Sequence, residues 1–218
     1  MKVTTDACIL GAWTPLKPEV KNVMDIGTGT GLLSLMLAQR NPGIRIDAIE
    51  IDNTAKGQAS ENVKNSVWED RINVIEADAK EYCSDNKYDL IISNPPFFNN
   101  SLLSRKESEN RARHTKSISY SDLLKAIEVN LSDTGYASVL LPCPEYFQFY
   151  ELMVEAGLYE SRKLQIKHTR HSEAKRVVTV FGKAKPNESF FSELVIKEDD
   201  QNYTSAFKEL LAPFYLYL

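Results

Sequence analysis

Short apolar runs alternate with longer amphipathic stretches over most of the chain, and this pattern predicts the order of the elements. Apolar runs predict strands at residues 23–26, 46–51, 72–76, 90–93 and 137–141. Amphipathic stretches predict helices at residues 32–39, 54–65, 120–131 and 145–156, the last of which ends at Gly157. Strands that alternate with helices are typical of an α/β fold with a mainly parallel sheet.

The C-terminal part of the chain departs from this alternation. Two further predicted strands, residues 163–166 and 177–181, are separated only by "KHTRHSEAKR", so we expect them to form an antiparallel hairpin. One more strand is predicted at residues 194–197, followed by a short helix with Thr204 as its N-cap. We therefore expect a single domain over residues 1–218, with an N-terminal segment, residues 1–22, and a C-terminal strand–helix appendage, residues 186–218.

A glycine-rich loop, "VMDIGTGTGLL", follows the first predicted strand and opens the first predicted helix. Gly27, Gly29 and Gly31 allow a sharp turn and let a ligand approach the main chain closely. Leu32 stands where the dinucleotide-binding fingerprint has its third glycine. Asp25, at the strand end, is placed to meet an ammonium group. Dinucleotide enzymes and structural turns also contain such loops, so the loop alone does not identify a ligand.

Acidic residues at the next two strand ends narrow the choice of ligand. Glu50 closes the second predicted strand and can hold a ribose diol with both of its oxygens. Asp78, followed by Ala79, ends the third strand and can accept a hydrogen bond from an adenine amino group. Each acid taken singly can also be a solvated turn residue. Together with the glycine loop they predict S-adenosylmethionine, which has an amino group, a ribose diol and an adenine but no pyrophosphate.

The fourth predicted strand runs into "SNPPFFNN", an unusual strand end. Asn94 offers a side-chain acceptor, Pro95 and Pro96 form a rigid elbow, and Phe97 offers a flat apolar ring. Such a set suits a planar substrate that carries an amino group. The competing interpretation is a Pro-Pro turn that ends an edge strand.

The "SNPPFF" stretch resembles the (D/N/S)-P-P-(Y/F) motif of amino-group methyltransferases. The resemblance implies that the Asn94 side chain and the Pro95 carbonyl accept hydrogen bonds from the target NH2, while Phe97 stacks on the substrate. An exocyclic amine is a poor nucleophile because its lone pair is delocalised into the ring. Acceptors that hold its hydrogens favour a pyramidal nitrogen, and alignment with the methyl group supplies most of the catalysis.

A likeness over nearly the full length carries the interpretation further. The stretches "KVTTDACILGAW", "SNPPFF", "NRARHT" and "DDQNYTSAFKELLAPFYLYL" resemble the bacterial valine-tRNA adenine-37 N6-methyltransferases. The resemblance implies a Rossmann-like, S-adenosylmethionine-dependent methyltransferase fold, with a mainly parallel seven-stranded sheet and an antiparallel C-terminal hairpin. It also implies a cytoplasmic enzyme acting on the anticodon stem-loop of tRNA. Thr5, Asp6 and Asn94 are then expected to contribute to the cofactor site.

The charge pattern bears on the RNA partner. A net charge of −4 argues mildly against nucleic-acid binding, but the basic residues gather in residues 101–117 and 161–176. Both stretches are expected to face the cofactor opening and to contact phosphates around a flipped base. The expected RNA contacts are Arg105, Lys106, Arg111, Arg113, His114, Lys167, Arg170, Lys175 and Arg176. A solvated charged loop is the alternative for the first stretch.

Other features limit the functional classes. No apolar run is long enough for a transmembrane helix, so we expect no membrane partner. Cys8, Cys83 and Cys143 have neither CxxC nor zinc spacing, so we expect buried reduced thiols and no metal. No obligate protein partner is predicted. Alternatives to the tRNA enzyme are an rRNA guanine-N2 methyltransferase, which would share Phe97, a protein glutamine methyltransferase, and a non-catalytic RNA-binding relic of the fold.

Overall fold

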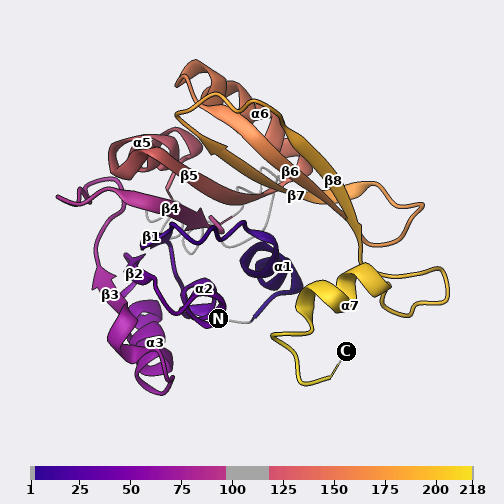
Figure 1. Cartoon of the computed structure of the whole chain (residues 1–218), viewed down its shortest axis with the longest axis horizontal. Coiled ribbons are helices and arrows are strands. Elements are labelled where there is room, and N and C mark those ends of the chain that lie inside the picture. The colour runs from indigo at the N-terminus through magenta and orange to yellow at the C-terminus, as the bar shows by residue number, and fades with distance from the viewer. Residues whose placement is uncertain (1–2, 97–117, 218) are drawn as a thin grey trace, which may run out of the picture.

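The computed structural model describes residues 3–96 and 118–217, which form a layered α/β structure (Figure 1). In the described residues one sheet has eight strands in the order β3-β2-β1-β4-β5-β7-β6-β8. The strands are β1 (Asn22–Ile26), β2 (Arg45–Glu50), β3 (Ile72–Glu76), β4 (Tyr88–Ser93), β5 (Leu131–Pro142), β6 (Tyr159–Lys167), β7 (Ala174–Gly182) and β8 (Phe190–Val195). The helices are α1 (Thr5–Trp13), α2 (Leu32–Arg40), α3 (Asn53–Lys64), α5 (Tyr120–Asn130), α6 (Cys143–Glu155) and α7 (Ser205–Leu211), with a 3-10 turn, η1 (Glu69–Arg71).

Seven of the eight strands in the described residues run in one direction, and β7 runs in the opposite direction. Five neighbouring strands, in the order β3, β2, β1, β4 and β5, are parallel to one another, because each is followed by a crossover connection. β7 runs antiparallel to both β5 and β6, as the predicted hairpin requires. β8 then adds to the outer side of β6 in the parallel direction. The sheet therefore has one strand more than the seven expected, because the C-terminal strand joins it at the edge.

Helices cover both faces of the sheet and create two hydrophobic clusters. Figure 1 shows α5 and α6 over one face, and α1, α2 and α7 over the other. Successive residues of β4 alternate between the clusters, with Leu90 and Ile92 on one side and Ile91 on the other. Such a strand is buried on both faces, which explains its nearly continuous apolar sequence. This two-sided core fixes the strand ends that carry the candidate site.

The predicted elements are present, with some corrections. Gly157 has a φ of 71°, and the Thr204 side chain accepts the N–H of Phe207 at 3.1 Å, which confirms both caps. β8 covers Phe190–Val195 and not residues 194–197. Helix α1 was not expected, because its buried residues, Ala7 to Gly11, follow one another without polar interruption and form no amphipathic stripe.

Two further observations concern the general properties of the chain. Cys8 is buried as expected, whereas Cys83 is exposed and Cys143 is partly exposed, and all three thiols are free. Exposed Cys83 corrects the expectation that all three would be buried. In residues 3–96 and 118–217, no helix combines the length and apolar character needed to span a membrane.

Candidate active site

The carboxyl ends of β1, β2, β3 and β4 meet at one edge of the sheet and enclose a cavity of about 350 Å³. In an open parallel sheet this edge is the usual place for a ligand. The cavity is lined by Ile26, Gly27, Ile49, Glu50, Ile51, Ala77, Asp78, Ala79, Lys80, Asn94, Pro95, Pro96 and Ile118. The structure thus brings together the predicted groups from four consecutive strand ends.

The glycine loop is held open toward this cavity. Gly27, Gly29 and Gly31 have φ values of 70°, 60° and 81°, a left-handed conformation that side chains other than glycine rarely adopt. The N–H groups of Gly27 and Thr28 donate to the Ile49 carbonyl at 2.9 and 3.0 Å, which ties the loop to β2. A Cβ added at Gly27 would meet no atom within 4 Å. The main chain at Gly27 is therefore accessible to a ligand.

Asp25 lies behind the loop, outside the lining of the cavity. Its Oδ2 accepts the hydroxyls of Thr28 at 2.6 Å and Ser34 at 2.7 Å, which connects β1 to the loop and to α2. Burial raises the pKa of this carboxyl to about 6, against the lowering effect of the two hydroxyls. In the described residues Oδ1 is buried and has no hydrogen-bond partner. The contacts of Oδ2 give Asp25 an organising role in the loop, and contact of its carboxylate with an ammonium group stays a prediction.

Glu50 combines a structural role with spare acceptor capacity. The side chain is buried, and its Oε2 accepts the Gly29 N–H while Oε1 accepts the Asp52 N–H, both at 2.9 Å. A carboxylate oxygen has two lone-pair sites, so each oxygen can accept one more hydrogen bond. Glu50 therefore fixes the loop and still presents two acceptors to the cavity.

The wall beside Glu50 is mostly apolar. Ile51, 40% exposed, and Ile118 belong to the lining, although neither was predicted as a site residue from the sequence. Ile51 was recognisable in principle, because it is an apolar residue directly after the acid of a strand end. Asp78 also lies here, and its Oδ1 accepts the Lys80 N–H at 3.0 Å while the Lys80 ammonium is 3.3 Å from Oδ2. Such a wall suits a flat ring with a polar edge.

Asn94 presents an unsatisfied acceptor at the end of β4. Its Oδ1 is buried and, within the described part of the chain, makes no hydrogen bond. The strand end is fixed by the Ser93 hydroxyl, which donates to the Ile26 carbonyl at 2.9 Å. Pro95 is buried and Pro96 is exposed, and both line the cavity with Asn94. Phe97 lies outside the described residues.

The predicted N-terminal contacts lie elsewhere. Thr5 and Asp6 occupy the first turn of α1, and neither belongs to the lining of the cavity. Asp6 Oδ2 is 3.2 Å from Nε of Arg176, a residue that was expected to contact RNA. These two residues therefore join α1 to β7 through an ion pair.

Two other basic residues of the β6–β7 hairpin also meet acidic partners. Lys167 pairs with Glu193 at 2.7 Å and Arg170 with Glu198 at 3.6 Å, so acids of the C-terminal appendage compensate the basic hairpin. Lys175 is exposed. The expected contacts of the first basic stretch, Arg105, Lys106, Arg111, Arg113 and His114, lie outside the described residues.

Comparison with known proteins identifies the class of protein to which this fold belongs. The family model of the methyltransferase small domain matches residues 13–115. A predicted O-methyltransferase from Agrobacterium tumefaciens has a similar structure, with a TM-score of 0.75 at 17% identity over 97% of this chain and 98% of that one. A TehB-like methyltransferase from Corynebacterium glutamicum gives a TM-score of 0.55 at 16% identity, covering 84% of this chain and 89% of that one. The fold is that of the methyltransferases.

Curated relatives define the family within this class. Proteins named tRNA1(Val) (adenine(37)-N6)-methyltransferase match from Dyadobacter fermentans at 42% identity and from Trichodesmium erythraeum at 41%, each covering 99% of this chain and 91% of the relative. The protein of that name from Proteus mirabilis is 38% identical over 100% of this chain and 88% of the relative. The chain belongs to the tRNA1(Val) (adenine(37)-N6)-methyltransferase family, which confirms the resemblance seen in its sequence.

Proposed function

We propose that this protein transfers a methyl group from S-adenosylmethionine to the N6 amine of adenine 37 in the anticodon loop of a valine tRNA. The observation that supports it most strongly is the buried, unpartnered Oδ1 of Asn94 in the same cavity as Glu50. A buried acceptor without a partner is unfavourable unless a ligand supplies the missing donor. The amine of adenine is such a donor, and the family relatives bear the name of this reaction.

The residues of the cavity fit the cofactor. Glu50 has two acceptors to spare for a ribose diol, and Asp78 can accept from the adenine amine. Ile51 and Ile118 supply apolar contacts for a ring, and the open main chain at Gly27 admits the amino-acid part of the molecule. When bound, S-adenosylmethionine supplies an electrophilic methyl group on a sulfonium.

Asn94 and Pro95 are proposed to prepare the amine for attack. The Asn94 Oδ1 and the Pro95 carbonyl each accept one N–H of the target, so that the nitrogen becomes pyramidal and its lone pair becomes available. Pro95 and Pro96 have fixed φ angles, which keeps these acceptors in place before the substrate arrives. The nitrogen bonds to the methyl carbon as the bond between that carbon and the sulfonium sulfur breaks, with the electron pair left on the sulfur of a neutral thioether. The methylated nitrogen is then cationic, so it readily loses one proton to water. The described residues that line the cavity include no histidine, and this reaction needs no strong base.

Nucleoside analysis tests the proposed function directly. The purified protein is incubated with S-adenosylmethionine and an unmodified valine tRNA transcript, and the digest is analysed by mass spectrometry. N6-methyladenosine at position 37 is expected, and a transcript with guanine at position 37 is the matched control. Parallel reactions contain ribosomal RNA or total protein in place of the tRNA. Appearance there of N2-methylguanosine or of methylglutamine, while the tRNA stays unmodified, would contradict the proposal.

A further inference from the structure

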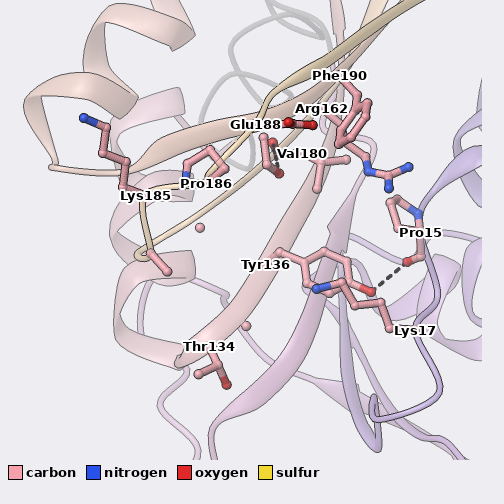
Figure 2. Close-up of a pocket in the computed structure, with 14 residues that line it drawn as sticks. Pro15, Lys17, Thr134, Tyr136, Arg162, Val180, Lys185, Pro186, Glu188 and Phe190 are labelled. Carbon is pink, nitrogen blue, oxygen red and sulfur yellow. Dashed lines mark hydrogen bonds between the residues drawn. The ribbon is translucent and has the colours of Figure 1, made fainter.

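A second cavity, of about 260 Å³, lies away from the candidate active site, near the start of β5 and the end of β7 (Figure 2). The parallel strands begin at this side of the sheet, whereas the candidate active site lies where they end. Its charged and aromatic lining residues are Lys17, Tyr136, Arg162, Lys185, Glu188 and Phe190. None of them belongs to the site described above.

Two cation–aromatic pairs organise this cavity. Tyr136 is held by a hydrogen bond of 2.8 Å from its hydroxyl to the Pro15 carbonyl, and the Lys17 ammonium lies 5.2 Å from its ring centroid. Arg162 and Phe190 are register partners on β6 and β8, so both side chains point to the same face. The Arg162 guanidinium lies 5.3 Å from the Phe190 ring centroid. Figure 2 shows Arg162 between Phe190 and Pro15.

The cations of the cavity differ from those of the hairpin in their partners. Over residues 3–96 and 118–217, Lys17, Arg162 and Lys185 make no ion pair with a carboxylate, although Glu188 also lies in the lining. Contact with an aromatic ring orders a cation but leaves its N–H groups free to donate. A guanidinium ordered in this way is well suited to a phosphate.

We propose that this cavity binds an unpaired nucleotide of the RNA substrate, with the phosphate held by Lys17 and Arg162 and the base against Phe190. The inference rests on the proposed function, because it assigns a second contact to the same RNA. Phe190 is 55% exposed, which leaves part of its ring available for stacking. The volume of about 260 Å³ is below the roughly 300–1,000 Å³ typical of small-molecule sites, so the cavity admits the phosphate and part of one nucleotide and excludes a duplex.

The neighbouring surface favours a polymer over a free nucleotide. Phe191, 62% exposed, follows Phe190 on β8, and the Lys163 ammonium lies 4.6 Å from its ring centroid. Adjacent residues of a strand point to opposite faces, so this second pair lies on the other face of the same sheet edge. A chain that wraps around this exposed edge can stack one base on each face, beside a cation in both cases. A free nucleotide would engage only one of these faces.

A binding experiment with matched controls tests this site. Affinity for full-length, unmodified valine tRNA is measured by fluorescence anisotropy for the parent and for the double variant Arg162→Ala/Phe190→Ala. Loss of one stacking contact and one phosphate contact is expected to weaken binding by about tenfold or more. Arg162→Ala alone should reduce the slope of affinity against salt by about one. Melting curves check that each variant is folded.

The controls change the same residue types elsewhere. Arg45→Ala removes an exposed cation at the start of β2, and Phe147→Ala removes an exposed ring on α6. Both should bind tRNA within about twofold of the parent. A folded double variant that binds tRNA as well as the parent would overturn the proposal. Binding of AMP that is lost in the double variant, with tRNA affinity unchanged, would assign the cavity to a free nucleotide and also overturn it.

Single-turnover methyl transfer at saturating tRNA separates this inference from the proposed function. The double variant should transfer at the parent rate, because the changed residues do not line the cavity of Asn94. If the parent methylates another base while the double variant still binds tRNA poorly, the proposed function fails and this inference stands. If the parent methylates adenine 37 and the double variant binds normally, only this inference fails.

Discussion

The candidate active site and the β6–β7 hairpin differ in whether their polar side chains have partners within the protein. At the active site, Asn94 Oδ1 is buried without a partner, and Glu50 retains acceptor capacity. At the hairpin, Lys167 and Arg170 are matched with carboxylates of the C-terminal appendage. The sequence had marked both regions as binding regions, one by its motif and the other by its charge. We infer from this comparison that unused hydrogen-bonding capacity is a better guide to a ligand site than the density of like charges.

The energies support this distinction. A buried acceptor without a partner carries a free-energy penalty of about 1–3 kcal/mol, so a ligand that donates a hydrogen bond to it removes this penalty when it binds. An exposed ion pair contributes about 0–1 kcal/mol and already satisfies both of its members. Changes at the cavity should therefore have large effects on catalysis or cofactor binding. Changes at the hairpin should have small ones.

The largest effect is expected for Asn94→Ala. If the side-chain oxygen holds the reacting amine, its loss should slow methyl transfer about a hundredfold or more, corresponding to roughly 2.7–4 kcal/mol, with little effect on cofactor or RNA binding. Single-turnover kinetics at saturating tRNA measure the rate. Asn73→Ala, which removes an exposed amide on β3, is the control. Transfer at the parent rate by Asn94→Ala would remove Asn94 from the mechanism.

The second prediction tests whether burial raises the pKa of Asp25, which lies behind the glycine loop of the same site. Its pKa is raised from 3.8 to about 6 in the folded protein, so between these values the folded state binds more protons than the unfolded state. The contribution of Asp25 to the free energy of unfolding is therefore lost as the pH rises through this range, and the total loss is about 3 kcal/mol. Asp25→Asn removes the titration.

Urea unfolding between pH 4 and 7 measures this effect. The parent should lose stability relative to Asp25→Asn as the pH rises, with most of the change complete just above pH 6. Asp70→Asn, which removes one carboxylate from the η1 turn, is the control for net charge. A pH-independent difference between parent and Asp25→Asn would show that Asp25 is not perturbed by its burial.

Glu50 tests whether spare acceptor capacity binds the cofactor. Glu50→Gln keeps the shape of the side chain but replaces one acceptor by a donor, so S-adenosylmethionine affinity should fall by about 1–3 kcal/mol. Isothermal calorimetry measures it directly. The control is Glu76→Gln, because Glu76 is the register partner of Glu50 on β3 but does not line the cavity. Equal affinities of parent and Glu50→Gln would place the ribose elsewhere.

Local patterns explain why much of the cavity could be predicted from the sequence. The glycine loop, Glu50, Asp78 and Asn94 each follow directly from a strand, and parallel strands bring their carboxyl ends to one edge. The position of Asp25 behind the loop could not be predicted, because it depends on hydroxyls of Thr28 and Ser34 that turn toward it.

The ion pairs of the hairpin and the N-terminal helix escaped prediction for a different reason. The acidic run at residues 197–200 was visible in the sequence, but only the path of the chain after β8 places Glu198 beside Arg170. Similarly, α1 is buried against α2 and β5, so it lacks the polar face by which a surface helix is recognised. Pairings between distant segments follow from tertiary packing and leave no periodic signal.

The smallest effect is expected at the hairpin. Lys167→Gln removes a cation that is already compensated at 2.7 Å, so tRNA affinity should change by no more than about twofold. Glu193→Gln should instead raise the affinity slightly, because it releases the Lys167 charge, and the gain should vanish at high salt. Glu151→Gln removes an exposed acid from α6 and corrects for the change in net charge. Anisotropy titrations at two salt concentrations measure all three. A tenfold loss in Lys167→Gln would mean that the hairpin leaves its acidic partners when RNA binds, and the contrast between the two regions would then hold only for the free protein.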